Sequence, residues 1–274
     1  MALRINNNSA SVFAQKHLSR SQERLQGNFE KLSSGLRITK AADDSAGLAI
    51  SETMRADIRS LSVAMRNTND GISMVQTAES ALGEIGSALS RMRELAVQSA
   101  SGVLQSTERA YLNTEFQAVS AEIDRIAKVT EFNGLKLSNA TTVIDVQVGI
   151  GTTAATDQVK VGLQDVTAAT LKINAVKIST AAEGVAAIAI VDTALGSNNA
   201  ARATFGSAQN TLTSALHNLE SYSENLVAAE SRIRDVDFAS ETADMTRNSI
   251  FQQAGVAVLA QANVSPQVAL QLLQ

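Results

Sequence analysis

The side chains that could perform chemistry are few and widely separated in this chain. His17 and His217 are the only histidines, and neither has a second ligand at the spacing of a metal site. Cysteine is absent, so disulfides and thiolate catalysis are excluded. Aspartates at 43–44 and at 235–237 bring carboxylates close in sequence, but no nucleophile, base and orienting group can be assembled around them. We therefore expect no catalytic, cofactor or metal site, and interpret these aspartates as connector residues and helix caps.

Composition and charge narrow the remaining classes of function. The formal net charge is −4 over 274 residues, which leaves no basic stripe to attract nucleic acid or anionic lipid. No stretch approaches the roughly 18 consecutive apolar residues that a membrane span requires. Met1 to Arg20 lacks a central apolar core, so we expect no cleavable secretory signal. Gly149-Ile150-Gly151 lacks the rest of a dinucleotide fingerprint and is interpreted as a turn. We expect the chain to bind neither nucleic acid nor a membrane.

Two helical segments must organise the chain, because each carries an apolar stripe at alternating steps of four and three. That spacing is the period of a coiled-coil seam. The first seam, within 51–98, consists of Met54, Ile58, Leu61, Met65, Thr68, Ile72, Val75, Glu79, Leu82, Gly86 and Leu89. The second consists of Leu212, Ala215, Leu219, Tyr222, Leu226, Ala229 and Ile233. A single helix with such a stripe is unstable in water, so the two are predicted to pack on each other.

Helical periodicity also covers the amino-terminal part of the chain on both sides of the first seam. Arg4 to Leu32 is predicted to be a helix, with a break at 33–35 and a short connector after it. Asp43 or Asp44 is predicted to cap the long helix, which should end near Ser99. Thr107 is predicted to cap a third helix. A helical pattern returns from Thr180 to Arg234, weakened around 196–199, and again from Ala239 to Gln274.

The middle of the chain has a different periodicity. Apolar and polar residues alternate at 144–150 and 159–163, and less clearly at 171–175, which predicts short strands. Asn133-Gly134 is a turn signal just before them. We therefore expect a mainly α fold, in which long antiparallel helices form a coiled-coil rod with a small β-rich excursion at 135–178.

The order of these segments suggests a nested division into two domains. Residues 1–42 and 238–274 would form a terminal-helix domain. Residues 43–237 would form a rod domain of long helices that includes the variable segment 135–178. The terminal helices carry apolar faces too large for two short helices to hide, so these faces are expected to pack on each other or on other subunits.

Several long sequence blocks lie at the two ends of the chain. They are Ile5-Asn6-Asn7-Asn8, Lys31 to Ile38, Ala41 to Ile50, Asn69 to Ser73, Arg91 to Gln98, Ile250 to Gly255, Leu259 to Asn263 and Leu270 to Leu273. These blocks closely resemble bacterial flagellin, occur in the same order as in that family and cover about 1–137 and 205–274. The segment between them is short, so the chain resembles a short flagellin without large outer domains.

The resemblance implies a structural role in the bacterial flagellum, outside the cell. Flagellins are exported unfolded through the flagellar secretion apparatus and self-assemble into a helical filament used for motility. Absent cysteine and a lone proline, Pro266, are compatible with such export. The implied partners are further copies of the chain, an export chaperone at the carboxyl-terminal helix, the filament cap and hook-junction proteins, and the Toll-like receptor for flagellin.

The resemblance also suggests roles for individual residues. Arg91, Leu95 and Glu115 match family positions that contact the Toll-like receptor, although they could equally serve subunit–subunit contacts. Glycans in this family are usually attached to the outward segment, so Thr141, Thr142, Thr152 and Thr153 are candidate sites. The residues predicted to pack between subunits, or within a two-helix core, are Leu18, Leu25, Phe29, Leu32, Ile250, Val258 and Leu272.

Two other functions fit part of the pattern. A hook–filament junction protein shares the terminal helices but is present in few copies, and the carboxyl-terminal block favours flagellin over it. A secreted coiled-coil adhesin would need an elaborate exposed binding domain, for which 135–178 is small. An enzyme is the weakest interpretation, because no site can be assembled.

Overall fold

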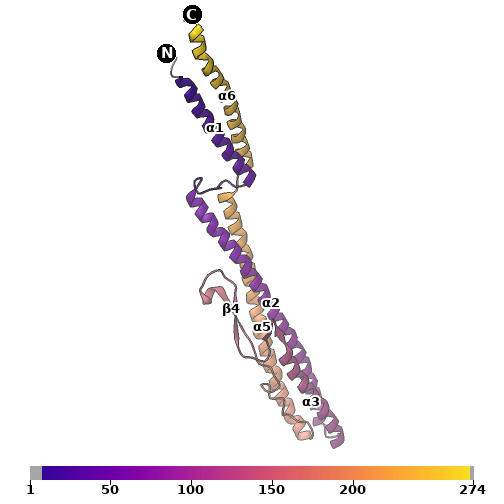
Figure 1. Cartoon of the computed structure of the whole chain (residues 1–274). Helices are drawn as coiled ribbons and strands as arrows, with labels where there is room; N and C mark the ends of the chain where they lie inside the picture. Colours follow the sequence, from indigo (N-terminus) through magenta and orange to yellow (C-terminus); the bar gives the residue numbers. More distant parts are fainter. Residues whose placement is uncertain (1–7, 272–274) are drawn as a thin grey trace. The chain divides into compact units, whose positions relative to one another are not determined.

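The computed structural model describes residues 8–271, with side chains up to residue 264. Long helices packed against one another dominate the fold, and two small hairpins lie in mid-chain (Figure 1), which confirms the predicted fold class. The helices are α1 (Ser9–Ser34), α2 (Ser45–Ala100), α3 (Ser106–Val129), α4 (Ala154–Asp157), α5 (Ala181–Arg234) and α6 (Phe238–Gln271). The strands are β1 (Glu131–Phe132), β2 (Leu135–Lys136), β3 (Val143–Gln147) and β4 (Gln158–Gly162).

The chain forms two compact units. Unit 1 consists of residues 1–56 and 225–274, and unit 2 of residues 57–224. Helices α2 and α5 contribute residues to both units. The sequence suggests a different division, with boundaries at residues 42 and 238, close to the connectors between helices. That division stays a prediction.

Short polar side chains begin and end the helices, largely where the sequence suggests. Gly35 ends α1 with φ 72°, in the left-handed region of backbone conformation, which favours glycine. Asp44 accepts a hydrogen bond of 2.9 Å from the Gly47 amide and so begins α2, as predicted. The predicted Thr107 cap is wrong, because Gln105 is the N-cap of α3. The main-chain amide of Gln105 donates to the Glu108 carboxylate at 2.9 Å. A glutamate three residues after the N-cap can satisfy the free main-chain amide of the cap residue, whereas Thr107 is already the second residue of the helix.

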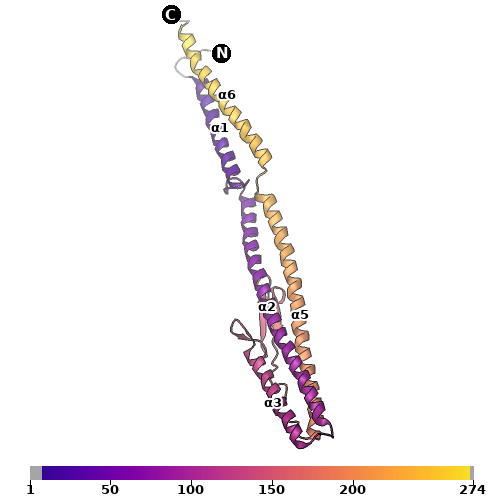
Figure 2. The same ribbon diagram turned by 90° about the vertical axis from the view of Figure 1, so that its right-hand side faces the viewer.

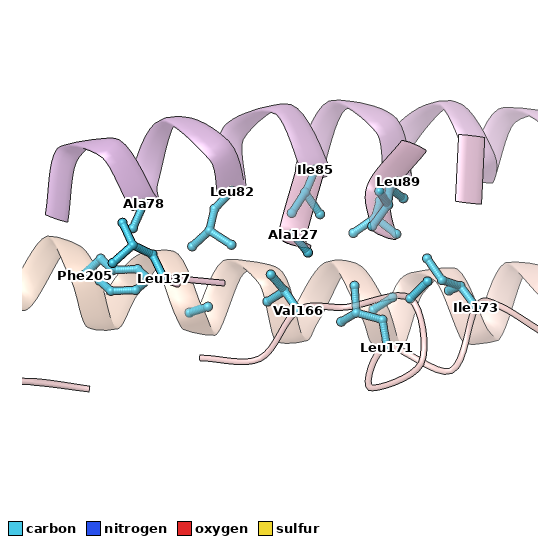
Figure 3. Packing of buried hydrophobic residues seen from close by; sticks show 14 of the residues in the cluster. Ala78, Leu82, Ile85, Leu89, Ala127, Leu137, Val166, Leu171, Ile173 and Phe205 are labelled. Atoms are coloured by element: carbon cyan, nitrogen blue, oxygen red, sulfur yellow. The ribbon is translucent and has the colours of Figure 1, made fainter. Parts of the chain in front are cut away.

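The core of unit 2 lies between α2, α3, α5 and the segment 137–178 (Figure 3). One half of the predicted α2 seam is buried: Leu61, Thr68, Val75, Leu82 and Leu89. The other half is displaced by one residue, because α2 contacts three neighbours rather than one and therefore buries a broader face. Met65, Ile72, Glu79 and Gly86 are only half-buried, whereas Ala64, Gly71, Ala78, Ile85 and Met92 are buried.

Helix α5 is continuous through 196–199, where weakening was predicted. Its buried face follows the same alternating steps upstream of Leu212, with mostly small members: Gly184, Ala187, Val191, Ala194, Asn198, Ala201, Phe205 and Ala208. In the two views α2 and α5 lie side by side (Figures 1 and 2), and Asn198 of α5 hydrogen-bonds to α2. Tyr222, predicted on the seam, is 44% exposed instead.

The mid-chain segment contains two antiparallel hairpins. Asn133 and Gly134 form the turn between β1 and β2 with positive φ values of 51° and 78°, as expected of this turn pair. Strand β3 pairs with β4 from Val143 opposite Gly162 to Gln147 opposite Gln158. The third predicted strand, at 171–175, is wrong. Leu171 and Ile173 are buried there in a segment of turns, and the chain just after it is held by Ser99 of α2 and Gln117 of α3, which donate to the carbonyls of Ile178 and Val176.

In unit 1, α1 and α6 lie antiparallel, and polar groups hydrogen-bond across their contact. At one end, Asn8 donates to the carbonyl of Ala262 at 2.8 Å. Near the other end, Asn248 donates to Asn28, and Asn28 donates in turn to Glu241. Ala14 is the one buried apolar residue among the described residues of α1. The contact therefore combines polar hydrogen bonds with limited apolar burial.

Candidate functional site

The residues expected to contact an immune receptor are brought together only in part. Arg91 of α2 donates from Nη2 to Glu115 of α3 at 2.8 Å and from Nη1 to Glu94 at 2.9 Å. Both members of the Arg91–Glu115 pair are about half exposed. Leu95 is 1% exposed, so its side chain is part of the unit 2 core rather than of the surface. Arg91 therefore lies at the edge of the buried face of α2, and Leu95 lies within that face.

The Arg91 cluster is an ordered, charged surface feature. The hydrogen bonds that Arg91 donates to Glu115 and then to Glu94 raise the pKa of its guanidinium above the ordinary value, so the group carries a permanent positive charge. Exposed ion pairs contribute little to folding stability because water competes for both partners. Substitutions in the cluster should therefore cost little folding stability.

The residues predicted to pack between subunits separate into two groups. Leu18, Leu25 and Leu32 are half-buried on α1, at the spacing that also contains its buried residues Ser11, Ala14 and Asn28. Phe29, Ile250 and Val258 point away from the helix pair and are 55%, 59% and 59% exposed. Leu272 lies outside the described residues.

Other apolar side chains on the terminal helices are also exposed and were not singled out from the sequence. Phe13 and Phe251 are 66% and 52% exposed, and the group includes Val12, Phe238, Val256 and Val264. Phe13 stacks edge-on against His17, with ring centroids 4.5 Å apart. The sequence contains a signal for these residues, because they lie outside the heptad positions of α1 and α6. Large apolar surface left outside a helix pair marks an interaction surface.

The candidate glycosylation sites are accessible. Thr141 and Thr142 directly precede β3, and Thr152 and Thr153 directly precede α4. All four residues are exposed. They lie at opposite ends of the β3 strand, so they do not form one cluster.

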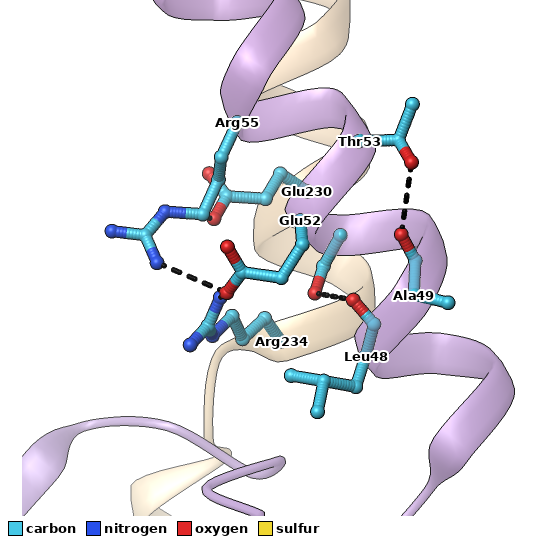
Figure 4. A network of polar contacts seen from close by, with 8 residues as sticks. Leu48, Ala49, Glu52, Thr53, Arg55, Glu230 and Arg234 are labelled. Atoms are coloured by element: carbon cyan, nitrogen blue, oxygen red, sulfur yellow. Dashed lines mark hydrogen bonds and ion pairs between the residues drawn. The ribbon is translucent and has the colours of Figure 1, made fainter. Parts of the chain in front are cut away.

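A polar network joins the start of α2 to the end of α5 in unit 1 (Figure 4). Arg234 is 9% exposed and donates from Nη1 to Glu52 at 2.5 Å. Glu52 also accepts from Arg55 at 3.3 Å, and Arg55 lies 3.6 Å from Glu230. The bond from Arg234 lowers the pKa of Glu52. Sequence analysis missed this network, because its members are 182 residues apart and no spacing rule connects them.

Acidic and histidine side chains do not gather into a metal-binding cluster among the described residues. No group of three or more histidine, aspartate or glutamate side chains in that part of the chain could hold a metal ion. The aspartates interpreted as connector residues and caps take both roles. Asp43 accepts from the amides of Thr39 and Lys40 within the connector, and Asp237 caps α6 by accepting from the amide of Ala239. None of the helices within the described range is long and apolar enough to cross a membrane.

Comparison with known proteins identifies the family. The model of the bacterial flagellin N-terminal helical region matches residues 5–142, and that of the C-terminal helical region matches residues 188–273. Flagellin of Halalkalibacterium halodurans is 46% identical over 98% of this chain and 99% of its own length. Flagellin of Bacillus subtilis is 41% identical over 99% of this chain and 100% of its own.

A solved structure agrees with these matches. The crystal structure of Bacillus cereus flagellin is 35% identical, with a TM-score of 0.51 over 60% of this chain and 94% of that one. Family models and relatives together span nearly the whole sequence, including both terminal regions. The chain therefore belongs to the bacterial flagellin family, a family of structural proteins that build the filament of the flagellum, an extracellular appendage.

Proposed function

We propose that this chain self-assembles into a helical filament through the outward apolar faces of α1 and α6. The observation that carries the proposal is the apolar surface left outside the terminal helix pair. The inner contact combines polar residues, such as Asn28 and Asn248, with half-buried leucines, such as Leu18, while Phe29, Ile250 and Phe251 are exposed. A pair arranged in this way buries little apolar surface alone and gains burial when other copies cover it.

Membership of the flagellin family favours an open polymer over a closed oligomer. Contacts between different surfaces of identical chains form a helical filament when the rotation between copies does not close. Export as an unfolded chain, as the family resemblance suggests, fits the absence of cysteine and the single proline.

Seeded growth tests the proposal. Purified chain is mixed with short filament fragments in precipitant salt, and length is followed by electron microscopy. The expected result is filaments of uniform width whose length grows with added chain. Monomers or short capped stubs, under conditions in which the Bacillus subtilis relative polymerises, would contradict the proposal and favour a hook–filament junction protein.

We further propose that an export chaperone covers α6 before secretion, and that cap and hook-junction proteins contact the finished filament ends. Ile250, Phe251, Val256 and Val258 are each more than half exposed on this helix, and such a surface needs cover in the cytosol. Co-purification with the flagellar chaperone of the same organism tests the first part. Replacing Ile250 and Val258 by serine should weaken that complex, and equal binding of the variant would contradict it.

Recognition by the Toll-like receptor for flagellin is proposed to use the Arg91–Glu115 pair as its accessible part. Leu95 would act from beneath, by holding α2 in place. Replacing Arg91 and Glu115 by alanine should reduce signalling in reporter cells, with the exposed Arg125–Glu122 pair of α3 as the matched control. Undiminished signalling by the Arg91 and Glu115 variant would contradict the idea.

Glycans at Thr141, Thr142, Thr152 or Thr153 are proposed as well, and mass spectrometry of native filaments tests them.

A further inference from the structure

The two connectors that link the terminal helices to the rest of unit 1 lie against each other. Leu36 and Asp235 form an antiparallel bridge. The Arg37 amide donates to the Arg234 carbonyl at 2.6 Å, and the Val236 amide donates to the Gly35 carbonyl at 3.0 Å. Segments 200 residues apart in sequence are thus joined by their main chains.

Arg37 adds a side-chain contact to this bridge. Its guanidinium donates to the Ile233 carbonyl from Nη2 at 2.5 Å and from Nε at 3.2 Å. The last carbonyls of a helix have no partner within it, so a basic group there both satisfies the carbonyl and complements the helix dipole. The first connector therefore caps the end of α5.

Arg234 is the buried element of the same region. It precedes the second connector directly, its carbonyl accepts the bridge bond from Arg37, and its guanidinium pairs with Glu52 of α2. Its Nε is buried and has no partner among the described residues. Burying a charge is costly, and removing its single counter-charge leaves that cost uncompensated. Arg55 and Glu230 extend the network on the helices, and Arg37 and Asp235 are the charged residues of the connectors that lie at the bridge.

We propose that the Arg234–Glu52 pair is a latch that holds the connectors, 35–44 and 235–237, together as one body. The latch sets the directions in which α1 and α6 leave the start of α2 and the end of α5. This inference rests on the proposed filament function, because every subunit must then present the same apolar faces to its neighbours. Arg234 is a positioning residue in this scheme and not a contact between copies.

Hydrogen exchange of the full-length chain tests the latch. The amides of Arg37 and Val236 report it directly, because both are bonded across the bridge. Arg234→Met keeps most of the buried stem but removes the charge, and Glu52→Gln keeps the shape of the partner. Each should speed exchange in peptides covering 35–38 and 234–238 by about tenfold or more, since a local opening becomes accessible. Arg234→Lys retains the charge and should stay closer to the unmodified chain.

Two comparisons make the result decisive. Arg125→Met removes an exposed ion pair on α3 and should leave exchange at the connectors unchanged. Exchange in the α2 segment 61–95 should also stay slow in the latch variants. Unchanged connector exchange in both Arg234→Met and Glu52→Gln would overturn the inference. Equal acceleration throughout α2 and α5 would overturn it too, because the pair would then stabilise the whole chain and not the connectors.

Filament growth separates this inference from the function on which it rests. If the unmodified chain forms no filaments, the proposed function fails whatever the exchange data show. If it forms filaments and the latch variants exchange normally, only the latch is wrong. Faster exchange at the connectors together with slower seeded growth is the outcome that supports both.

Discussion

Asn198 of α5 donates a hydrogen bond from Nδ2 to the main-chain carbonyl of Leu82 on α2, at 3.1 Å across the core of unit 2. Both residues are fully buried. Gly86 lies one turn further along α2, and a Cβ there would stand 3.1 Å from Asn198 Nδ2. The absent side chain thus makes room for the amide. A single buried asparagine in an apolar helix contact fixes the register of the two helices.

This relationship predicts a coupled effect of two substitutions. Gly86→Ala alone should change the free energy of unfolding little, because a gain in helix propensity of about 1 kcal/mol is offset by a strained or lost hydrogen bond of about 1 kcal/mol. In an Asn198→Ala background, the same change should stabilise by about 1 kcal/mol, since the obstacle is gone. Urea unfolding followed by circular dichroism measures both. Equal effects in the two backgrounds would show that the residues are independent.

Gly184 predicts a different outcome. A Cβ at this position would stand 2.7 Å from the main-chain nitrogen of Ala100, at the contact between the start of α5 and the end of α2. Because main chain cannot yield as a side chain can, Gly184→Ala should destabilise by about 1–3 kcal/mol. Gly196 lies in the same helix with nothing within 4 Å, so Gly196→Ala should instead stabilise by up to about 1 kcal/mol. A thermal melt distinguishes the two signs, and a stabilising Gly184→Ala would contradict the close approach.

Glu52 predicts how stability depends on pH. Its pKa is lowered in the folded chain, chiefly by the hydrogen bond from Arg234, relative to 4.5 as the reference for a free side chain. The pair therefore stabilises the fold fully above pH 4.5, and this contribution is lost as pH falls through the lowered folded value. The difference in melting temperature between the unmodified chain and Glu52→Gln should be largest at neutral pH and close toward acid. A gap that widened in acid would have the wrong sign for this assignment.

Phe29 tests the outward face of the terminal helices. It is 55% exposed on α1 and makes no part of the buried core, so Phe29→Ser should leave the melting temperature of the monomer nearly unchanged. It should raise the concentration of chain required for filament growth, because apolar burial between copies is lost. Val63→Ser on α2, at 46% exposure, is the comparison outside the terminal helices. An equal effect of both changes would argue against a special role for this face.

Much of the fold could be predicted from the sequence, because long helices depend on local spacing. The bounds of α2 and α5, the Asp44 cap, the Asn133-Gly134 turn and the β3–β4 pair all follow from residue type and short-range period. The prediction of a third strand at 171–175 failed, because Leu171 and Ile173 alternate with their neighbours for another reason. They fill the core from a turn segment held by Ser99 and Gln117, and those contacts are remote in sequence.

The same distinction between local and long-range information applies to the candidate functional site. The sequence by itself determined the family, since long motif blocks are local information. Only the tertiary structure decided that Leu95 is buried, that Asn198 belongs to the core, and that Arg234 pairs with Glu52. Burial and ion pairing depend on which distant segment covers a side chain, and no short-range pattern records that partner.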